Sequence, residues 1–361
     1  PAFYIGKGKA QQVIDQAKLL GANVIIFDDE LSPAQIKNYH KLAKKIKVID
    51  RSSLILDIFK KHAKTREAKT QVELALCQYL LPRLTRQWTH LERQMGGVGT
   101  RAGMGETQIE VDRRLIRDKI SKLKLDLTKI ESERKTQSQN RVNEFRVALV
   151  GYTNAGKSTL FNSLTGNNVY VKNQLFATLD TTVRKLKLNK KHQVLISDTV
   201  GFIRKLPHNL VASFKSTLKE LLEANHILIV LDASSKIIDE HLETISQVLN
   251  ELGANEIPKS YIFNKIDLVE NENDIKKLKS NYRNAILTSA LHHLRLDDVK
   301  NHLIEKIESD FNVFDLNISY EQGKILSQIQ NQAEILDTDY GDKGIKLKIR
   351  GKEDSIKRLF R

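Results

Sequence analysis

The chain has 361 residues, of which 40% are hydrophobic, enough for about two or three globular domains. Its 59 Lys and Arg outnumber its 44 Asp and Glu, so the formal net charge of +15 favours an anionic partner, nucleic acid first, over a merely Lys-rich surface. The single cysteine excludes internal disulfides and multi-cysteine metal sites, and no apolar run approaches the ~20 residues that span a bilayer. We expect a cytoplasmic protein, monomeric and without membrane contact.

The first part of the chain, residues 1–53, alternates short β-rich runs with amphipathic helical runs. This alternation predicts a small parallel α/β domain. Ser32, Pro33 and Gln35 have the residue types of a helix N-terminus: a capping serine, a proline in the first turn and the glutamine of a capping box. We expect the second helix to begin there.

Two helical runs follow, at about 54–93 and 107–138, with the glycine-rich segment 96–105 between them. They predict an antiparallel helical hairpin. Pro82 should kink or end the first helix just before it. The polar run 132–140 is a candidate linker. The second helix has apolar residues at heptad spacing: Ile116, Ile120, Leu123, Leu127 and Ile130.

Residues 151–158 read GYTNAGKS, a GxxxxGKS loop between a predicted strand and a predicted helix. In that context backbone N–H groups and the helix N-terminus face a phosphate, Lys157 reaches the β- and γ-phosphates, and Ser158 is a ligand of Mg²⁺. We therefore expect a nucleotide with Mg²⁺ as cofactor. The predicted phosphate-binding residues are Gly151, Tyr152, Thr153, Asn154, Ala155, Gly156, Lys157 and Ser158.

A second motif, DTVG, comprises Asp198, Thr199, Val200 and Gly201 and follows the strand-like run QVLIS. An isolated DxxG is more often a turn, but after a P-loop Asp198 is placed to hold a Mg²⁺ water and the Gly201 N–H to sense the γ-phosphate. Phe202 follows, where many GTPases have a glutamine that orients the attacking water. We expect slow hydrolysis until a partner completes the site. The alternative is that Phe202 packs inside the domain and another residue orients the water.

Asn264, Lys265, Ile266 and Asp267 form NKID after the strand-like run SYIF, and this motif predicts guanine selection. The Asp267 carboxylate can accept two hydrogen bonds from guanine that adenine cannot supply. We expect Asn264 to bond the other edge of the base and the Lys265 stem to pack along it. A backbone N–H for guanine O6 is expected from the next loop: Ser289, Ala290 and Leu291.

The segment 176–184, FATLDTTVR, is the candidate switch I, and it offers three threonines for Mg²⁺. Thr178 is preferred and Thr182 is the second choice; Thr181 is the other threonine of the segment. Ser158 and Thr178 are therefore the predicted metal ligands, and the residues predicted to act on the γ-phosphate during hydrolysis are Lys157, Thr178 and Gly201.

The predicted fold class is α/β and multidomain. It has a small N-terminal parallel α/β domain (1–53), an antiparallel helical hairpin (54–140), a doubly wound P-loop GTPase domain (141–310) and a small C-terminal α+β module (311–361). For the last module we expect a strand, a helix, the strand IKLKIR and a short helix. Its first helix is predicted from the spacing of Ile325, Ile329, Ala333 and Leu336.

The chain resembles the HflX family of ribosome-associated GTPases over nearly its whole length. TREAKTQVELALCQYLLPRLT at 65–85 and GGVGTRAGMGETQIEVDRRLIRDKI at 96–120 are similar to the two-helix linker and glycine-rich loop of that family. DTVGF at 198–202, which we term switch II, is similar to a family switch segment. So is FATLD, and the resemblance places the Mg²⁺ threonine at Thr178 within it: Phe176, Ala177, Thr178, Leu179 and Asp180. Met104 departs from the proline expected in the family's loop.

The resemblance implies binding to the 50S ribosomal subunit, with the loop near the peptidyl-transferase centre, and splitting of stalled or idle 70S ribosomes. Residues 83–117 favour rRNA contact independently, since four arginines, a histidine and Trp88 accompany one acidic residue between 83 and 101. Three more arginines follow: Arg113, Arg114 and Arg117. Two alternatives are a GTP-dependent RNA-binding or ribosome-assembly module, and a signalling GTPase without an RNA partner.

Overall fold

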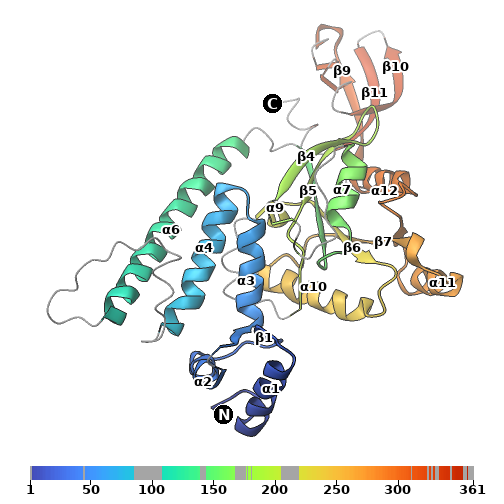
Figure 1. The fold of residues 1–361 in the computed structure, drawn as a ribbon. Coiled ribbons are helices and arrows are strands. Elements are labelled where there is room, and N and C mark those ends of the chain that lie inside the picture. Colours follow the sequence, from blue (N-terminus) through green and yellow to red (C-terminus); the bar gives the residue numbers. More distant parts are fainter. Residues whose placement is uncertain are drawn as a thin grey trace.

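The structure is a computed structural model, drawn as a ribbon in Figure 1. It describes residues 2–43, 45–84, 108–138, 144–166, 176, 178–179, 181–204, 219–309, 311–322, 325–326, 328–329, 333–341, 344–352 and 356. The predicted loop 96–105, Trp88, Ala177 and Asp180 lie outside these residues. Among the described helices, none combines the length and the hydropathy that a membrane crossing needs.

The N-terminal part is built on two parallel strands, β1 (Val24–Phe27) and β2 (Lys47–Asp50). Helices α1 (Lys7–Leu19) and α2 (Pro33–Ala43) share one buried apolar cluster with them. The Gln35 N–H donates to Ser32 Oγ at 3.2 Å and the Ser32 N–H donates to Gln35 Oε1 at 2.8 Å, which confirms the predicted capping box.

The first predicted long helix is in fact two helices, α3 (Arg51–His62) and α4 (Arg66–Leu80). The expectation of one helix over 54–93 is wrong because Thr65 is extended and caps α4, its Oγ1 accepting the Ala68 N–H at 3.1 Å. The chain then forms a 3-10 turn, η1 (Leu81–Arg83), which contains Pro82. The predicted stop just before Pro82 is confirmed.

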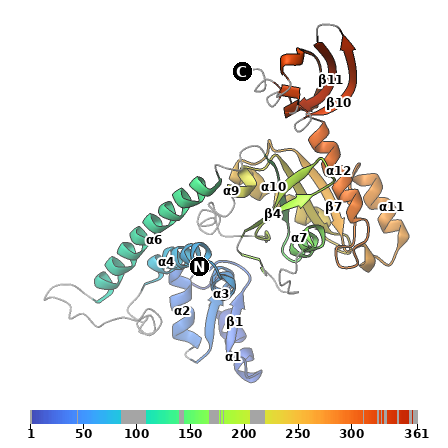
Figure 2. The ribbon, with the colours of Figure 1, turned by 90° about the horizontal axis from the view of Figure 1, so that it is seen from above.

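Helix α6 (Gln108–Ser138) runs beside α4, and together they form the predicted helical hairpin (Figures 1 and 2). Ile116 and Leu123 of the heptad are buried with Leu74 and Cys77 of α4, and Ile120 and Leu127 pack against the same cluster. The candidate linker 132–140 is wrong in its first part, because α6 continues to Ser138.

A six-stranded sheet forms the centre of the molecule, in the order β4, β5, β3, β6, β7, β8. All neighbours are parallel except β4 and β5. The strands predicted before the GxxxxGKS loop, at QVLIS and at SYIF are confirmed as β3, β5 and β7, and β4 is an addition that the sequence did not indicate. The strands are β3 (Phe145–Gly151), β4 (Thr182–Lys187), β5 (Gln193–Asp198), β6 (His226–Asp232), β7 (Lys259–Asn264) and β8 (Ile286–Leu287).

Helices cover both faces of this sheet, as expected for a doubly wound fold. Helices α7 (Lys157–Thr165) and α12 (Leu296–Glu308) share the apolar core of one face. On the other face, α9 (Lys219–Leu222), α10 (Ile238–Leu252) and α11 (Glu272–Asn281) share a core with α3 and α4. The central sheet is therefore packed directly against two helices from the preceding part of the chain.

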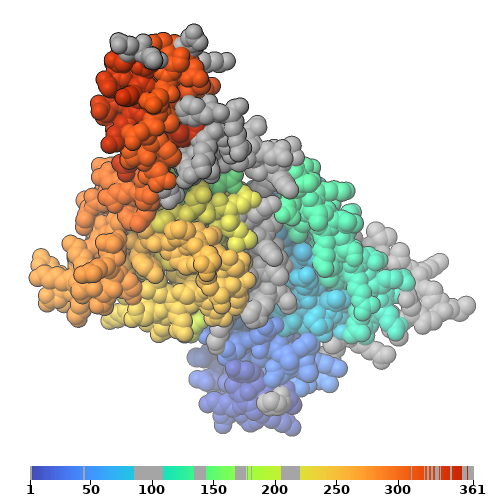
Figure 3. All heavy atoms as spheres, turned by 180° about the vertical axis from the view of Figure 1, so that it is seen from behind, coloured from blue at the N-terminus to red at the C-terminus, as the bar shows by residue number. Residues whose placement is uncertain are grey.

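The C-terminal part is a three-stranded antiparallel sheet, ordered β10, β11, β9, which projects from one end of the molecule (Figure 3). Its strands are β9 (Phe311–Ile318), β10 (Glu334–Gly341) and β11 (Gly344–Lys352), with a 3-10 turn, η4 (Tyr320–Gln322), after β9. The predicted helix is wrong at Leu336, which lies in β10 and is exposed. The run IKLKIR is a strand as predicted.

Candidate nucleotide-binding site

One cavity of about 420 Å³ opens where β3, β5 and β7 end, and all the predicted motif segments contribute to its wall. Strand ends of this kind are where doubly wound sheets bind their ligands. Thr159 and Leu268 also line it and were not predicted, although each directly follows a motif residue. The predicted residues in the wall are Thr153, Asn154, Gly156, Lys157, Ser158, Phe176, Thr178, Thr199, Gly201, Asn264, Lys265, Asp267, Ser289 and Leu291.

Other predicted residues lie behind this wall. The described ones are Gly151, Tyr152, Ala155, Leu179, Asp198, Val200, Ile266 and Ala290. Leu179 and Val200 are buried in the core that the sheet shares with α3 and α4, so they anchor the two switch segments. Thr182, the second choice for a metal ligand, is part of strand β4 and is not in the wall.

The phosphate end of the cavity is formed by the turn into α7. Gly156 has a φ of 89°, and a Cβ there would lie 2.2 Å from Asn264 Nδ2, so only glycine fits. Lys157 is buried and its Nζ donates to the carbonyls of Gly151 and Tyr152, at 3.1 and 3.0 Å. Burial lowers the pKa of Lys157 to about 8, against the opposing effect of nearby Asp198. Because both hydrogen-bond partners of this amine are neutral carbonyls, a bound anion can replace them.

Beside Lys157, three oxygen-bearing side chains converge. Ser158 Oγ donates to Asp198 Oδ2 at 2.6 Å and lies 2.6 Å from Thr178 Oγ1. Asp198 Oδ1 is buried without a hydrogen-bond partner among the described residues, and burial raises the pKa of this carboxyl while the Ser158 hydroxyl lowers it. Hard oxygen donors around an unsatisfied carboxylate fit Mg²⁺.

Switch II lies against the phosphate loop through backbone hydrogen bonds. The Phe202 N–H donates to the Gly151 carbonyl at 3.0 Å, and the Thr153 N–H donates to the Phe202 carbonyl at 2.7 Å. The Phe202 side chain is buried in the core shared with α3 and α4. The alternative interpretation of Phe202, a packing residue, agrees with this placement, and its ring offers no group for water.

At the base end, Asn264 is occupied by the protein itself. Its Nδ2 donates to the Ala155 carbonyl at 3.1 Å and its Oδ1 accepts the Ala290 N–H at 2.9 Å. Asn264 therefore ties the phosphate loop to the loop after β8, and it also lines the cavity, so its bond to the base edge stays a prediction. Asp267 is paired differently: its Oδ2 lies 3.6 Å from the exposed His292, so its carboxylate stays accessible for guanine.

The charged end of Lys265 is bound by the protein. Its Nζ forms an ion pair with Asp232 Oδ2 at 2.6 Å, and its backbone has a φ of 64°. The aliphatic stem still contributes to the cavity wall, which is compatible with packing along a base.

The predicted RNA-contact segment 83–117 is described only at its ends. Arg83 is buried and pairs inside the protein, so its inclusion among the RNA-contacting arginines is wrong. Arg113, Arg114 and Arg117 are exposed on α6.

Comparisons with known proteins agree with the site. Families described as "GTP-binding GTPase N-terminal", "GTP-binding GTPase Middle Region" and "50S ribosome-binding GTPase" match residues 1–60, 62–141 and 146–265. GTPase HflX of Escherichia coli (strain K12) is 44% identical over 91% of this chain and 77% of its own length. The protein of the same name from Caldanaerobacter subterraneus is 43% identical over 96% of this chain and 80% of its own.

Among solved structures, a GTP-binding protein from the hyperthermophilic archaeon Sulfolobus solfataricus, in complex with GDP, is 26% identical. Its TM-score is 0.46, with 84% of this chain and 85% of that chain covered. The relatives settle the family on sequence alone. This chain belongs to the HflX family of GTPases, proteins that bind GTP and hydrolyse it.

Proposed function

We propose that this GTPase binds the large ribosomal subunit and splits stalled or idle 70S ribosomes in a nucleotide-dependent way. The observation that carries the proposal is the match of residues 146–265 to a family described as a 50S ribosome-binding GTPase. The exposed basic face of α6 supports it. Arg113, Arg117 and Lys124 recur at helical spacing on that face, where cations can contact RNA phosphates.

Within the cavity we assign roles by geometry. Lys157 and the Gly201 N–H bind the γ-phosphate, and Asp267 selects guanine. Ser158 and Thr178 would be ligands of Mg²⁺, and Asp198, which accepts the Ser158 hydroxyl hydrogen bond, would add negative charge beside them. When bound, Mg²⁺ neutralises charge on the β- and γ-phosphates. The remaining motif residues shape the walls, and Asn264 positions the phosphate loop through Ala155.

Sedimentation tests the proposal directly. The protein is mixed with 50S subunits or 70S ribosomes, with a non-hydrolysable GTP analogue or GDP, and gradients report both binding and subunit separation. We expect binding to 50S and loss of the 70S peak with the GTP analogue only. Ser158→Ala, which removes a proposed metal ligand, is the negative control for the triphosphate state.

The alternatives give different outcomes. Binding to 50S without any loss of 70S would favour an RNA-binding or assembly module. Absence of binding to either particle, in both nucleotide states, would favour a signalling GTPase and reject the proposal. Deleting residues 96–105 should abolish ribosome binding while leaving GTP affinity unchanged.

A further inference from the structure

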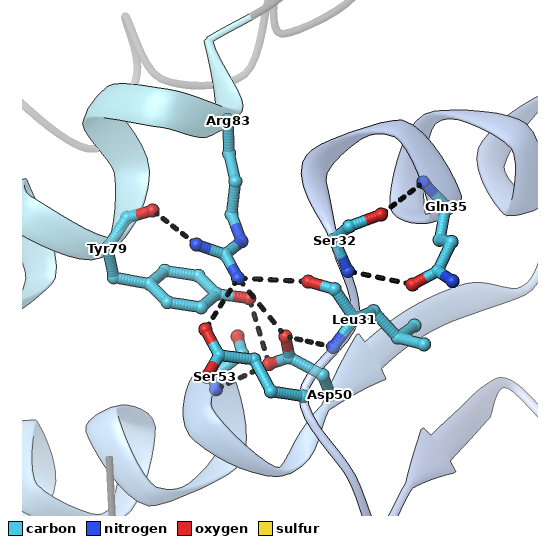
Figure 4. Close-up of polar contacts among 8 residues, drawn as sticks. Leu31, Ser32, Gln35, Asp50, Ser53, Tyr79 and Arg83 are labelled. Atoms are coloured by element: carbon cyan, nitrogen blue, oxygen red, sulfur yellow. Dashed lines mark hydrogen bonds and ion pairs between the residues drawn. The ribbon is translucent and has the colours of Figure 1, made fainter. Parts of the chain in front are cut away.

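The end of α4 is fastened to the N-terminal part by a buried arginine (Figure 4). Arg83 Nη2 donates to Glu30 Oε1 and to the Leu31 carbonyl, both at 3.0 Å, and lies 3.6 Å from Asp50 Oδ2. Its guanidinium stacks 3.8 Å from the ring centre of Tyr79, whose carbonyl accepts the Nη1–H at 3.0 Å. Arg83 thus fixes the turn that leads into residues 85–107.

Asp50 holds the opposite side of this network and is fully buried. Its Oδ1 accepts the Ser53 N–H at 2.8 Å and the Tyr79 O–H at 2.9 Å, and its Oδ2 accepts the Leu31 N–H at 3.2 Å (Figure 4). Asp50 is also the N-cap of α3. The start of α3 and the end of α4 are therefore bound to one carboxylate.

Arg51, the next residue, reaches in the other direction. Its Nη2 donates to the carbonyl of Arg204, two residues beyond switch II, at 3.0 Å, while its Nη1 pairs with Asp28. Further along α3, the Phe59 ring meets Phe176 of switch I edge-on, with ring centres 4.7 Å apart. Helix α3 thus contacts both segments that flank the phosphate end of the cavity.

Hydrogen bonds of the phosphate loop link Arg204 to the nucleotide. The Gly151 carbonyl accepts from both Lys157 Nζ and the Phe202 N–H, at 3.1 and 3.0 Å. The Tyr152 carbonyl accepts a hydrogen bond from Lys157 Nζ at 3.0 Å, and the Tyr152 hydroxyl oxygen accepts one from the Arg204 N–H at 3.3 Å. Lys157 and switch II therefore share one acceptor, the Gly151 carbonyl, so a movement of Lys157 toward a bound phosphate would alter a hydrogen-bonded group that also holds Phe202.

We propose that α3 couples the nucleotide state to the turn that precedes residues 85–107. Arg51 connects Arg204 to the start of α3, and the ion pair of Asp50 and Arg83 connects the start of α3 to η1. These three are positioning residues that do not touch the nucleotide. The inference rests on the proposed function, because 85–107 belongs to the segment proposed to contact rRNA. By linkage, a partner bound there shifts the preference for GTP over GDP by the same factor.

Replacing Arg51 gives the most specific test, because its guanidinium binds two partners. A guanidinium donates to Arg204 and Asp28 at once, whereas an ammonium is a single point charge that cannot bridge both partners. Arg51→Lys therefore keeps the charge and the helix while removing the bridge. Arg66→Ala, at an exposed arginine that begins α4, is the control, and Arg51→Ala is a second test variant.

Hydrogen exchange of the peptide 79–84 is measured on the full chain, saturated with GDP or with a non-hydrolysable GTP analogue. We expect the exchange rate in the parent and in Arg66→Ala to differ between nucleotides by about fivefold or more, the lower end of typical coupling. In both Arg51 variants the difference should fall to less than about twofold. A parent without nucleotide dependence, or Arg51 variants that retain it, would overturn the coupling.

This readout needs no ribosome, so the two proposals fail separately. Sedimentation of the same variants with 50S subunits follows. If exchange responds to nucleotide through Arg51 but no protein binds 50S, the coupling stands and the ribosomal function fails. If the parent binds 50S only with the GTP analogue and both Arg51 variants keep that discrimination, α3 is not the coupling element.

Discussion

Two buried aspartates end strands in this protein, and their surroundings are opposite. Asp50 ends β2, and both of its oxygens accept hydrogen bonds from the chain. Asp198 ends β5, and its Oδ1 is buried without a hydrogen-bond partner among the described residues. A carboxylate that the protein satisfies holds structure together. One that is left short of donors is suited to an external cation.

The buried cations differ in the same way. Arg83 is held by two acidic side chains and two carbonyls, which fix its plane. Among the described residues, Lys157 donates hydrogen bonds only to neutral carbonyls, and burial lowers its pKa to about 8, against the opposing effect of Asp198. The comparison therefore separates a junction in which a buried acid and a buried base pair inside the protein from a pocket in which the buried carboxylate keeps an oxygen without a partner among the described residues.

The largest expected effect concerns GTP hydrolysis, and it tests whether the pocket lacks a group that orients the attacking water. Because Phe202 is buried and cannot orient water, we expect slow single-turnover hydrolysis by the isolated protein and about 10³–10⁵-fold acceleration by 50S subunits. Phe202→Gln should lower stability without raising the rate, since the amide would enter an apolar core. Phe202→Leu is the packing control. A fast rate without ribosomes, unchanged by saturating subunits, would contradict this.

Exchanging the two aspartates for asparagine tests the comparison itself. Asp198→Asn should lower Mg²⁺-dependent hydrolysis by about 10³-fold, because a metal contributes several kcal/mol at about 1.4 kcal/mol per factor of ten. Burial disfavours the charge of Asp198, so unfolding of the nucleotide-free protein should become no easier.

Asp50→Asn should behave in the opposite manner. It removes the fully buried one of the two acidic partners of Arg83, and the loss of one partner from a buried ion pair costs about 3–5 kcal/mol in the free energy of unfolding. Hydrolysis per folded molecule should stay within about twofold of the parent, because replacing Asp50 removes no contact to the transition state. Denaturant titration and Mg²⁺-dependent GTPase assays on both variants check this, and equal losses of stability would remove the distinction.

The sequence identified the pocket because each of its parts is local. Lys157, Asp198 and Asp267 lie in short motifs directly after hydrophobic strands, so strand ends and chemistry are visible in the same few residues. Their convergence in one cavity then follows from the parallel sheet. The hydrogen bonds of Asn264 to two loops were not visible, and the packing of Phe202 was only an alternative, because a motif does not show whether a side chain faces the ligand or the protein.

The junction could not be found in this way. Arg83 binds Glu30, 53 positions away, and Arg51 binds Arg204, 153 positions away, with no pattern that relates them. Helical spacing also led to two wrong predictions. It continued across the cap at Thr65, and it predicted a helix at Leu336, where pairing with β11 forms a strand instead. Tertiary contacts decide such cases against local periodicity.

A smaller effect follows from the pKa of Lys157. Its pKa is about 8 in the folded protein and ordinarily 10.5, so between these pH values the unfolded chain binds a proton that the folded protein does not. The free energy of unfolding of the parent, minus that of Lys157→Met, should therefore be lowest below pH 8 and should rise by about 3 kcal/mol up to pH 10.5. Nucleotide-free parent and variant are unfolded in urea across this range. A flat difference would show that Lys157 is solvated.

The smallest effect concerns the base, where the pocket again offers a carboxylate that the protein leaves accessible. Asp267→Asn should weaken GTP binding by about 10- to 150-fold, the loss of one charged hydrogen bond of about 1.5–3 kcal/mol. It should also improve binding of XTP, because the amide can donate to the 2-oxo group that replaces the amino group of guanine. Asp232→Asn, which alters the partner of Lys265 and the acceptor of Ser234, is the matched control and should not favour XTP. Titrations with GTP and XTP measure the ratio of the two affinities. Unchanged GTP affinity without any gain for XTP would remove Asp267 from base recognition and leave its neighbour His292, 3.6 Å away, as its relevant partner.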